Sequence, residues 1–295
     1  ISYFGSGSDE AQMVYNFTLP PLLLHALISG EARRFSDWAR TLNTPSNQST
    51  FFNFTASHDG IGVRPLEGLL LPAQIGQLAA RVRQNGGRVS VKQNPDGSTS
   101  PYELNITYLD ALKDPDAVED PFHVPRFLAS QAVALALPGV PGIYIHSLLG
   151  SPNWAEGVRL TGRARTINRA PLPLEKIHAA LADRTSTRAR IFSAYREMLR
   201  VRTHQPAFHP SAPMQVLQLD DRVFSVKRSR DRQTLFALTN FTTACLTLAL
   251  PGSPGAPEMI DLIHGERVDP ASIWLSAYQT RWLTTEQPAS PNADS

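Results

Sequence analysis

The sequence predicts an α/β fold, with a parallel sheet or barrel over the first two thirds of the chain and a small antiparallel β domain after it. Short β-type runs alternate with helical patterns up to about residue 205, as they do in βαβ units. From Met214 onward, short alternating runs are separated by Asp-Asp, Asp-Arg and Pro-Gly turns, which favours antiparallel strands. With 295 residues and 42% hydrophobic content, the chain can bury the core of one large or two modest domains.

The N-terminal elements follow a strand–helix–strand order. Residues 11–17 predict a short strand. The Leu-rich segment after it has proline in its first turn and ends at Gly30, which are the start and stop signals of a helix. Residues 31–42 predict a second helical segment, and the aromatic run at 51–57 predicts the next strand, a buried one.

A long loop is expected at 84–121. It lies between a largely helical segment at 64–81 and another predicted helix at 122–137. Gly-Gly and Pro-Asp-Gly sequences mark turns around a short strand at 88–92. A long excursion of this kind between barrel elements is usually functional.

The segment IYIH at 143–146 predicts a second buried strand that ends in a polar group, His146. A polar, Arg-rich loop is expected at 151–170, and residues 187–203 predict an amphipathic helix. The expected division of the chain is a barrel portion at 1–205, an antiparallel β domain at 214–285 and a frayed polar tail at 286–295.

The composition argues against several classes of function. The net charge is +2 and no Lys/Arg block is interleaved with aromatics, so a nucleic-acid surface is not expected. There is neither a run of 18 apolar residues nor a signal peptide, so we expect no membrane partner and a cytoplasmic location. The single cysteine, Cys245, excludes an internal disulfide and a cysteine-based zinc site, and its apolar neighbours predict a place in a core strand.

The segment FFNFTASHDGIG at 51–62 carries the strongest chemical signal. An aromatic run ends in Ser57, His58 and Asp59 before a Gly-rich turn, as a buried strand does when it delivers polar groups to the mouth of a sheet or barrel. An imidazole beside a carboxylate suits sugar hydroxyls and a developing positive charge. Taken alone, the dipeptide is equally compatible with a structural turn that Asp59 caps.

Five segments together resemble the sucrose phosphorylase subfamily of glycoside hydrolase family 13, in the α-amylase clan. They are VYNFTLPPLLLHAL (14–27), SHDGIG (57–62), YELN (102–105), LPGVP (137–141) and RTINR (165–169). Their order and intervals fit this subfamily from residue 1 to about 285. The resemblance implies the C-terminal part of a (β/α)8 TIM barrel followed by a small antiparallel β domain.

The resemblance also implies a role for each site residue. Asp59 would stabilise an oxocarbenium-like transition state, and His58 would hydrogen-bond the same ring hydroxyls. Tyr102 would contact phosphate or acceptor from a mobile loop. Arg165 or Arg169 would contact the glucosyl unit, and the motif does not decide between the two.

Glu103 stands where sucrose phosphorylases usually carry Gln, which disfavours sucrose as the substrate. The runs at 146–150 and 161–169 look most like glucosylglycerate phosphorylases, and an anionic acceptor such as glycerate would fit the arginines between 159 and 169. The implied activity is therefore retaining α-glucosyl transfer to and from inorganic phosphate. The implied partners are a small glucoside and phosphate as co-substrate, with no metal and no other cofactor, and a homo-oligomer is possible.

The resemblance places the nucleophile Asp and the acid/base Glu of this mechanism on barrel strands that precede the matched region. The chain begins with Ile1 and is expected to be a fragment that is inactive and aggregation-prone on its own, because a half barrel exposes sheet edges. An α-glucoside hydrolase or transglucosidase of the same family remains an alternative. A non-catalytic carbohydrate-binding remnant is another.

Overall fold

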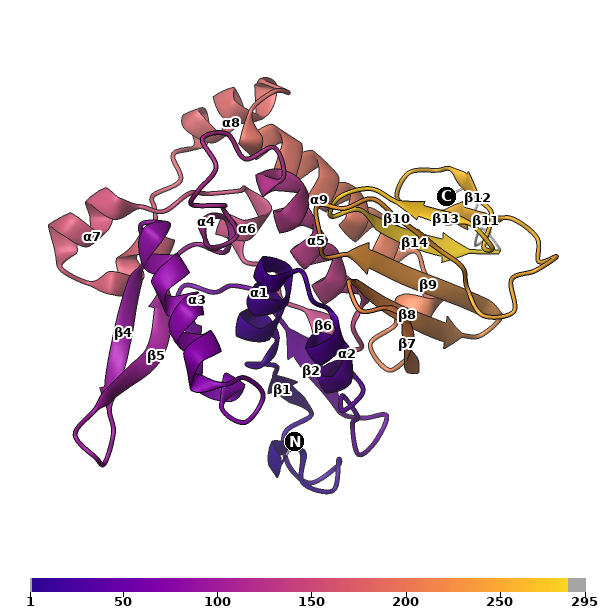
Figure 1. The fold of residues 1–295 in the computed structure, drawn as a ribbon, viewed down its shortest axis with the longest axis horizontal. Coiled ribbons are helices and arrows are strands. Elements are labelled where there is room, and N and C mark those ends of the chain that lie inside the picture. The colour runs from indigo at the N-terminus through magenta and orange to yellow at the C-terminus, as the bar shows by residue number, and fades with distance from the viewer. Residues whose placement is uncertain (1, 286–295) are drawn as a thin grey trace.

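The computed structural model describes residues 2–285, so the expected tail at 286–295 lies outside the described part of the chain (Figure 1). The N-terminal unit is built on a parallel sheet with the strand order β1 (Met13–Tyr15), β2 (Thr50–Asn53) and β6 (Val140–Pro141). Helices α1 (Leu19–Ser29) and α2 (Arg33–Ala39) connect β1 to β2. The predicted strand–helix–strand order is confirmed here, and a parallel pairing requires such a crossover.

Helix α1 is enclosed by its neighbours on nearly every side. Its leucines are almost completely buried, because α2, the later helix His123–Ala136 and the segment 61–66 pack against it. Proline occupies its first turn, where no amide hydrogen is needed, and Gly30 ends it in the left-handed conformation at φ 72°. Its boundaries therefore match the start and stop signals in the sequence.

The segment expected as a long loop at 84–121 contributes two strands to a second sheet, with the strand order β3 (Ile61–Gly62), β5 (Thr99–Asn105) and β4 (Arg88–Gln93). Strands β4 and β5 form a hairpin that projects from the body of the molecule (Figure 1). The helix expected at 64–81 is wrong in its first half. A short 3₁₀ turn, η2 (Arg64–Leu66), comes first, and Gly68 follows it with a positive φ of 83°, which is not helical. Helix α3 begins only at Pro72 and ends at Gln84.

Two long helices pack against each other behind the parallel sheet. They are α5 (His123–Ala136) and α9 (Thr187–Thr203), and both match their predicted ranges within a residue. The remaining elements of this unit are η1 (Ser2–Phe4), α4 (Tyr108–Ala111), α6 (Ile145–Leu148), α7 (Ala155–Thr161), η3 (Ala164–Asn168), α8 (Leu174–Ala182) and η4 (Pro206–Phe208).

The strand expected at 143–146 is wrong. Strand β6 is only two residues long and ends at Pro141, which has no amide hydrogen to donate to the ladder. His146 lies instead in the short helix α6 and is buried. It is therefore not a polar group at a strand end.

The C-terminal unit is antiparallel, as the sequence predicts. A six-stranded sheet has the order β12 (Arg267–Val268), β11 (Met259–Asp261), β14 (Thr280–Thr284), β9 (Gln233–Asn240), β8 (Val223–Arg230) and β7 (Met214–Asp220). A two-stranded sheet pairs β10 (Leu246–Leu248) with β13 (Ile273–Leu275). Cys245 is exposed just before β10, so its expected place in the core is wrong.

One hydrophobic core continues from the N-terminal unit into the β sheet. Phe35 of α2 packs edge-on against Phe224 of β8, with ring centroids 4.8 Å apart. Phe208 packs in the same way against Trp282 of β14 at 4.7 Å. The antiparallel sheet is thus held against the helices by aromatic packing. Across the described residues, every helix is too short or too polar to span a lipid bilayer.

His264 gives the β domain a pH-dependent contact. Its Nδ1 lies 2.7 Å from Oδ2 of Asp261, a buried carboxylate that also accepts a hydrogen bond from Arg281 at 2.9 Å. The hydrogen bond to Asp261 raises the pKa of His264, with Glu266 adding to the effect and Arg281 opposing it. We expect this contact to stabilise the fold fully below about pH 6.5, the ordinary value for histidine, and to weaken as the pH rises through the higher folded pKa.

The measurement is the difference in unfolding midpoint between the chain and its His264→Gln variant from pH 5 to pH 9. The difference should be largest at the acidic end and shrink toward pH 9. His178→Gln, at an exposed histidine on α8, serves as the control and should give no such trend. A His264→Gln difference that stays constant or widens with pH would contradict the assignment.

Candidate active site

Residues 54–60 form a loop that carries His58 and Asp59 to the rim of the parallel sheet. The strand expected at 51–57 ends earlier, at Asn53, which pairs with Pro141, the last residue of β6. The dipeptide therefore lies in the turn between β2 and β3, and not directly at a strand end. Within this loop, the backbone amide of Asp59 donates to Oγ of Ser57 at 3.1 Å.

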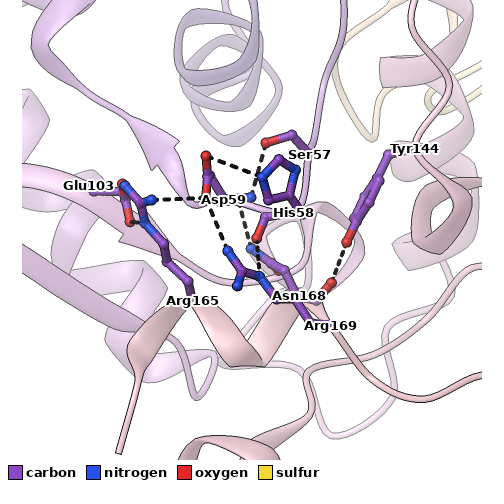
Figure 2. A network of polar contacts seen from close by, with 8 residues as sticks. All are labelled: Ser57, His58, Asp59, Glu103, Tyr144, Arg165, Asn168 and Arg169. Atoms are coloured by element: carbon purple, nitrogen blue, oxygen red, sulfur yellow. Dashed lines mark hydrogen bonds and ion pairs between the residues drawn. The ribbon is translucent and has the colours of Figure 1, made fainter.

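Asp59 lies between two arginines, as Figure 2 shows. Its Oδ1 accepts from Nη1 of Arg165 at 2.9 Å and from Nη2 of Arg169 at 3.2 Å. Its Oδ2 lies 3.7 Å from Nε2 of His58. One carboxylate oxygen is thus fixed by two cations, and the carboxylate is about two-fifths exposed, so it can still meet a ligand.

Glu103 holds Arg165 from the opposite side. Its two oxygens accept from Nε and Nη2 of Arg165 at 3.0 and 2.6 Å, a bidentate pair, and the Glu103 side chain is buried. These hydrogen bonds raise the pKa of the Arg165 guanidinium, and Asp59 adds to the effect. Gly60 makes this approach possible, because a Cβ there would lie 2.6 Å from Cγ of Glu103.

Tyr102 and Glu103 belong to strand β5, a paired strand of the hairpin sheet. Tyr102 therefore lies on a paired strand and not on the mobile loop that the resemblance implied. Adjacent residues of a strand point to opposite faces, so Glu103 turns inward to Arg165 while Tyr102 is nearly half exposed. Tyr102 still lines the cavities on either side of Glu103.

The 3₁₀ turn η3 positions both arginines and a residue that the sequence did not single out, Asn168. Nδ2 of Asn168 donates to the backbone oxygen of Asp59 at 3.0 Å, and Nε of Arg169 donates to that of His58 at 2.8 Å. The phenol of Tyr144 donates to the backbone oxygen of Asn168 at 2.6 Å. The only signal in the sequence that could have pointed to Asn168 is its place within the RTINR motif.

A cavity of about 730 Å³ opens beside this cluster. Its walls combine aromatic faces with the polar cluster, and include Phe17, Phe54, Asp59, Tyr102, Glu103 and Arg165. A second cavity of about 430 Å³ lies beyond the Glu103–Arg165 pair and is lined by Arg163, Arg165, Arg169 and Tyr102. Aromatic walls and fixed charges of both signs suit a sugar next to an anion.

The structure brings together all six predicted site residues: His58, Asp59, Tyr102, Glu103, Arg165 and Arg169. His146 is separate from them, since its imidazole is buried in α6, where burial and the Arg188 charge lower its pKa. Within residues 2–285, no group of three or more His, Cys, Asp or Glu side chains is placed to hold a metal ion.

No protein-family model matches the chain. The glucosylglycerate phosphorylase of Allomeiothermus silvanus is 45% identical over 284 residues, an alignment that covers 96% of this chain and 49% of that protein. The glucosylglycerate phosphorylase of Escherichia coli is 38% identical over 96% of this chain and 50% of its own length. The sucrose phosphorylase of Agrobacterium vitis is 32% identical over 69% of this chain and 40% of its length. The chain thus spans about half the length of the glucosylglycerate phosphorylases that it matches.

Solved structures show the same fold. The sucrose 6F-phosphate phosphorylase from Thermoanaerobacter thermosaccharolyticum superimposes with a TM-score of 0.68 at 23% identity, covering 90% of this chain and 49% of that one. An Anoxybacillus α-amylase superimposes with a TM-score of 0.60 at 12% identity, over 94% of this chain and 48% of that one. At these identities the likeness shows the fold, which is that of the α-amylase-like enzymes.

Proposed function

We propose that this chain supplies one side of an active site for α-glucosyl transfer to and from inorganic phosphate. The chain belongs to glycoside hydrolase family 13 and is homologous to the C-terminal half of its glucosylglycerate and sucrose phosphorylases. The preferred substrate is a glucosylglycerate-type glucoside. One observation carries the proposal: Asp59 is held by Arg165 and Arg169 at the wall of a cavity large enough for a sugar.

Asp59 stabilises the transition state in this mechanism. Cleavage of the glucosidic bond leaves positive charge spread over the anomeric carbon and the ring oxygen. A carboxylate already fixed by two guanidinium groups does not have to reorganise to face that charge. His58, whose Nε2 is 3.7 Å from Asp59, is placed to donate to a ring hydroxyl that the carboxylate also binds.

Glu103 serves as an anchor and not as a proton donor. Both of its oxygens accept hydrogen bonds from Arg165, so neither is available to protonate a leaving group. The nucleophile and the acid/base would then come from the half of the relatives that this chain does not match. We therefore propose that the 295-residue chain has no phosphorylase activity alone.

The phosphate and the acceptor meet the arginine side of the site. Phosphate must approach a centre that already contains carboxylates, and Arg165, Arg169 and Arg163 supply the opposite charge. Because Arg163 is exposed on the 430 Å³ cavity, that cavity offers more positive than negative charge to an incoming anion. This balance supports a carboxylate-bearing acceptor such as glycerate over a neutral one such as fructose.

The test uses a joined enzyme, in which the preceding half of the Allomeiothermus silvanus protein is fused to residue 1 of this chain. Glucose 1-phosphate is supplied as donor, and glycerate, fructose and glycerol are compared as acceptors by phosphate release. We expect glycerate to be used with the highest kcat/KM. Equal or better use of fructose would overturn the preference, and free glucose as the main product would favour the hydrolase alternative.

The Glu103→Gln variant tests the role of the anchor. The amide can accept one hydrogen bond from Arg165 but loses the second bond and the charge, so Arg165 is no longer held in one orientation. We expect kcat of the joined enzyme to fall roughly tenfold, equivalent to about 1.4 kcal/mol. Steady-state kinetics with saturating phosphate measure the change.

Glu67→Gln is the matched control for Glu103→Gln. Glu67 pairs with Lys92 of β4 at 2.7 Å on the exposed side of the same hairpin sheet. The same chemical change there removes only a surface ion pair, which contributes little. A similar loss of kcat in both variants would contradict a specific role for Glu103.

A further inference from the structure

Buried polar side chains connect the loop at 54–60, which carries His58 and Asp59, to helices α5 and α9. Oγ1 of Thr55 donates to Oε1 of Gln131 at 3.0 Å, and the phenol of Tyr195 donates to the same oxygen at 3.0 Å. Thr55 lies in the loop that carries Asp59, Gln131 lies on α5 and Tyr195 on α9. The contact therefore joins three segments that are distant in the sequence.

These three groups are buried where the loop at 54–60 meets α5 and α9. Gln131 has no exposed surface, and Tyr195 and Thr55 are 2% and 4% exposed. Such groups are costly to bury unless each is hydrogen-bonded, and here both lone pairs of the Gln131 oxygen are used. Its Nε2 donates to Oγ of Ser130 at 2.8 Å, which continues the network along α5. A buried hydrogen-bonded network of this kind favours one arrangement of the segments it joins.

Thr55 also forms part of the wall of the 730 Å³ cavity that contains Asp59. On its far side, the loop is held by Asn168 and Arg169, which bind the backbone oxygens of Asp59 and His58. The bond from Thr55 to Gln131 is the corresponding anchor on the core side. The loop is thus held on two sides. The contact on the core side depends on the packing of α5 against α9.

We propose that Gln131 is a positioning residue for the glucosyl-transfer site, acting through Thr55 to hold the loop that carries His58 and Asp59. The kinetic part of this inference rests on the proposed function. The structural part does not, because it concerns the order of residues 54–60 in this chain. A reacting carboxylate displaced by about 1 Å can lose up to a hundredfold in rate, so even a modest loosening is measurable.

The first test is amide hydrogen exchange on the 295-residue chain. Thr55→Val keeps the shape of the side chain and removes the donor, and Gln131→Leu removes the acceptor. We expect each to speed exchange over residues 54–60 roughly tenfold, and Thr55→Ser to restore the slow rate. The double variant should be no faster than Gln131→Leu alone, because that variant already lacks the bond from Thr55.

The matched control is Thr239→Val in the β domain. Thr239 of β9 shares a buried hydroxyl–hydroxyl hydrogen bond of 2.9 Å with Thr280 of β14, and both strands belong to the C-terminal six-stranded sheet. The Thr239→Val variant makes the same chemical change as Thr55→Val and also loses one buried hydrogen bond. If Thr239→Val speeds exchange over 54–60 as much as Thr55→Val does, or if Thr55→Val leaves that exchange unchanged, the proposal is overturned.

The second test is kinetic and uses the joined enzyme. Thr55→Val should lower kcat roughly tenfold while KM changes less than about threefold, and Thr239→Val should leave both within about twofold. Equal effects of the two variants on kcat would overturn the positioning role. If the unsubstituted joined enzyme has no activity, the proposed function fails, and the exchange experiment still decides the structural inference.

Discussion

Replacing Asp59 with Asn in the joined enzyme is expected to lower kcat by roughly a thousandfold, about 4 kcal/mol, the upper end for loss of one preorganised electrostatic group. The amide keeps the size of the side chain but cannot offset the positive charge that develops on the sugar ring. It also leaves Arg165 and Arg169 facing the ring without the carboxylate between them. The measurement is steady-state release of glucose 1-phosphate from glucosylglycerate and phosphate.

The control for this variant is Asp37→Asn. Asp37 of α2 pairs with Arg40 just after the helix, so the same substitution there removes an exposed aspartate–arginine pair that lines neither cavity of the site. We expect kcat within about twofold of the unsubstituted enzyme. An Asp59→Asn enzyme that retains more than a tenth of its kcat would show that Asp59 has a structural role in the turn, as the dipeptide alone allowed.

Replacing Arg228 with Met is expected to lower the free energy of unfolding by about 3 kcal/mol, the largest stability effect we expect in this chain. Arg228 has no exposed surface and donates to the backbone oxygens of Ala136, His209 and Ala212 at 2.6, 2.9 and 3.1 Å. Burial lowers the pKa of its guanidinium to about 9, so it remains charged near neutral pH. Methionine fills part of the space and leaves three carbonyl oxygens without this donor, of which those of Ala136 and Ala212 are buried.

Arg228 also explains how the two units stay together. It comes from β8 and binds the last carbonyl of α5, at the negative end of that helix dipole, while Arg202 of α9 binds the oxygen of Leu135 one residue earlier at 2.9 Å. The control is Arg230→Met, two residues along the same strand but partly exposed, which should change stability by less than about 0.5 kcal/mol. Chemical denaturation monitored by Trp fluorescence measures the stability of both variants. Equal effects would contradict the role of Arg228 in holding the two units together.

Local signals in the sequence predicted the helices and the C-terminal strands well. Helix α1 ends at Gly30 because a residue with positive φ is needed there, and α9 shows its buried face through apolar spacing. The strand assignment at 143–146 failed because the apolar run suggested a strand, whereas the actual ladder ends at Pro141 and residues 145–148 form a helix. Pairing is a property of the neighbouring strand, which the run itself does not encode.

In the candidate site, too, the sequence predicted the residues but not the contacts between them. His58, Asp59, Glu103 and the two arginines could be named from motifs, although their mutual geometry could not. The bidentate Glu103–Arg165 pair joins residues 62 positions apart, and only the tertiary fold places them together. Thr55 and Gln131 belong to no motif, and their contact depends on the packing of α5 against the loop at 54–60.

The most direct test of the account is the dependence of glucosyl transfer on phosphate. The joined enzyme is given glucosylglycerate with and without inorganic phosphate, and the products are followed by NMR. We predict α-glucose 1-phosphate and glycerate in equal amounts when phosphate is present, and little turnover without it. Release of free glucose at the same rate in both samples would contradict the central claim.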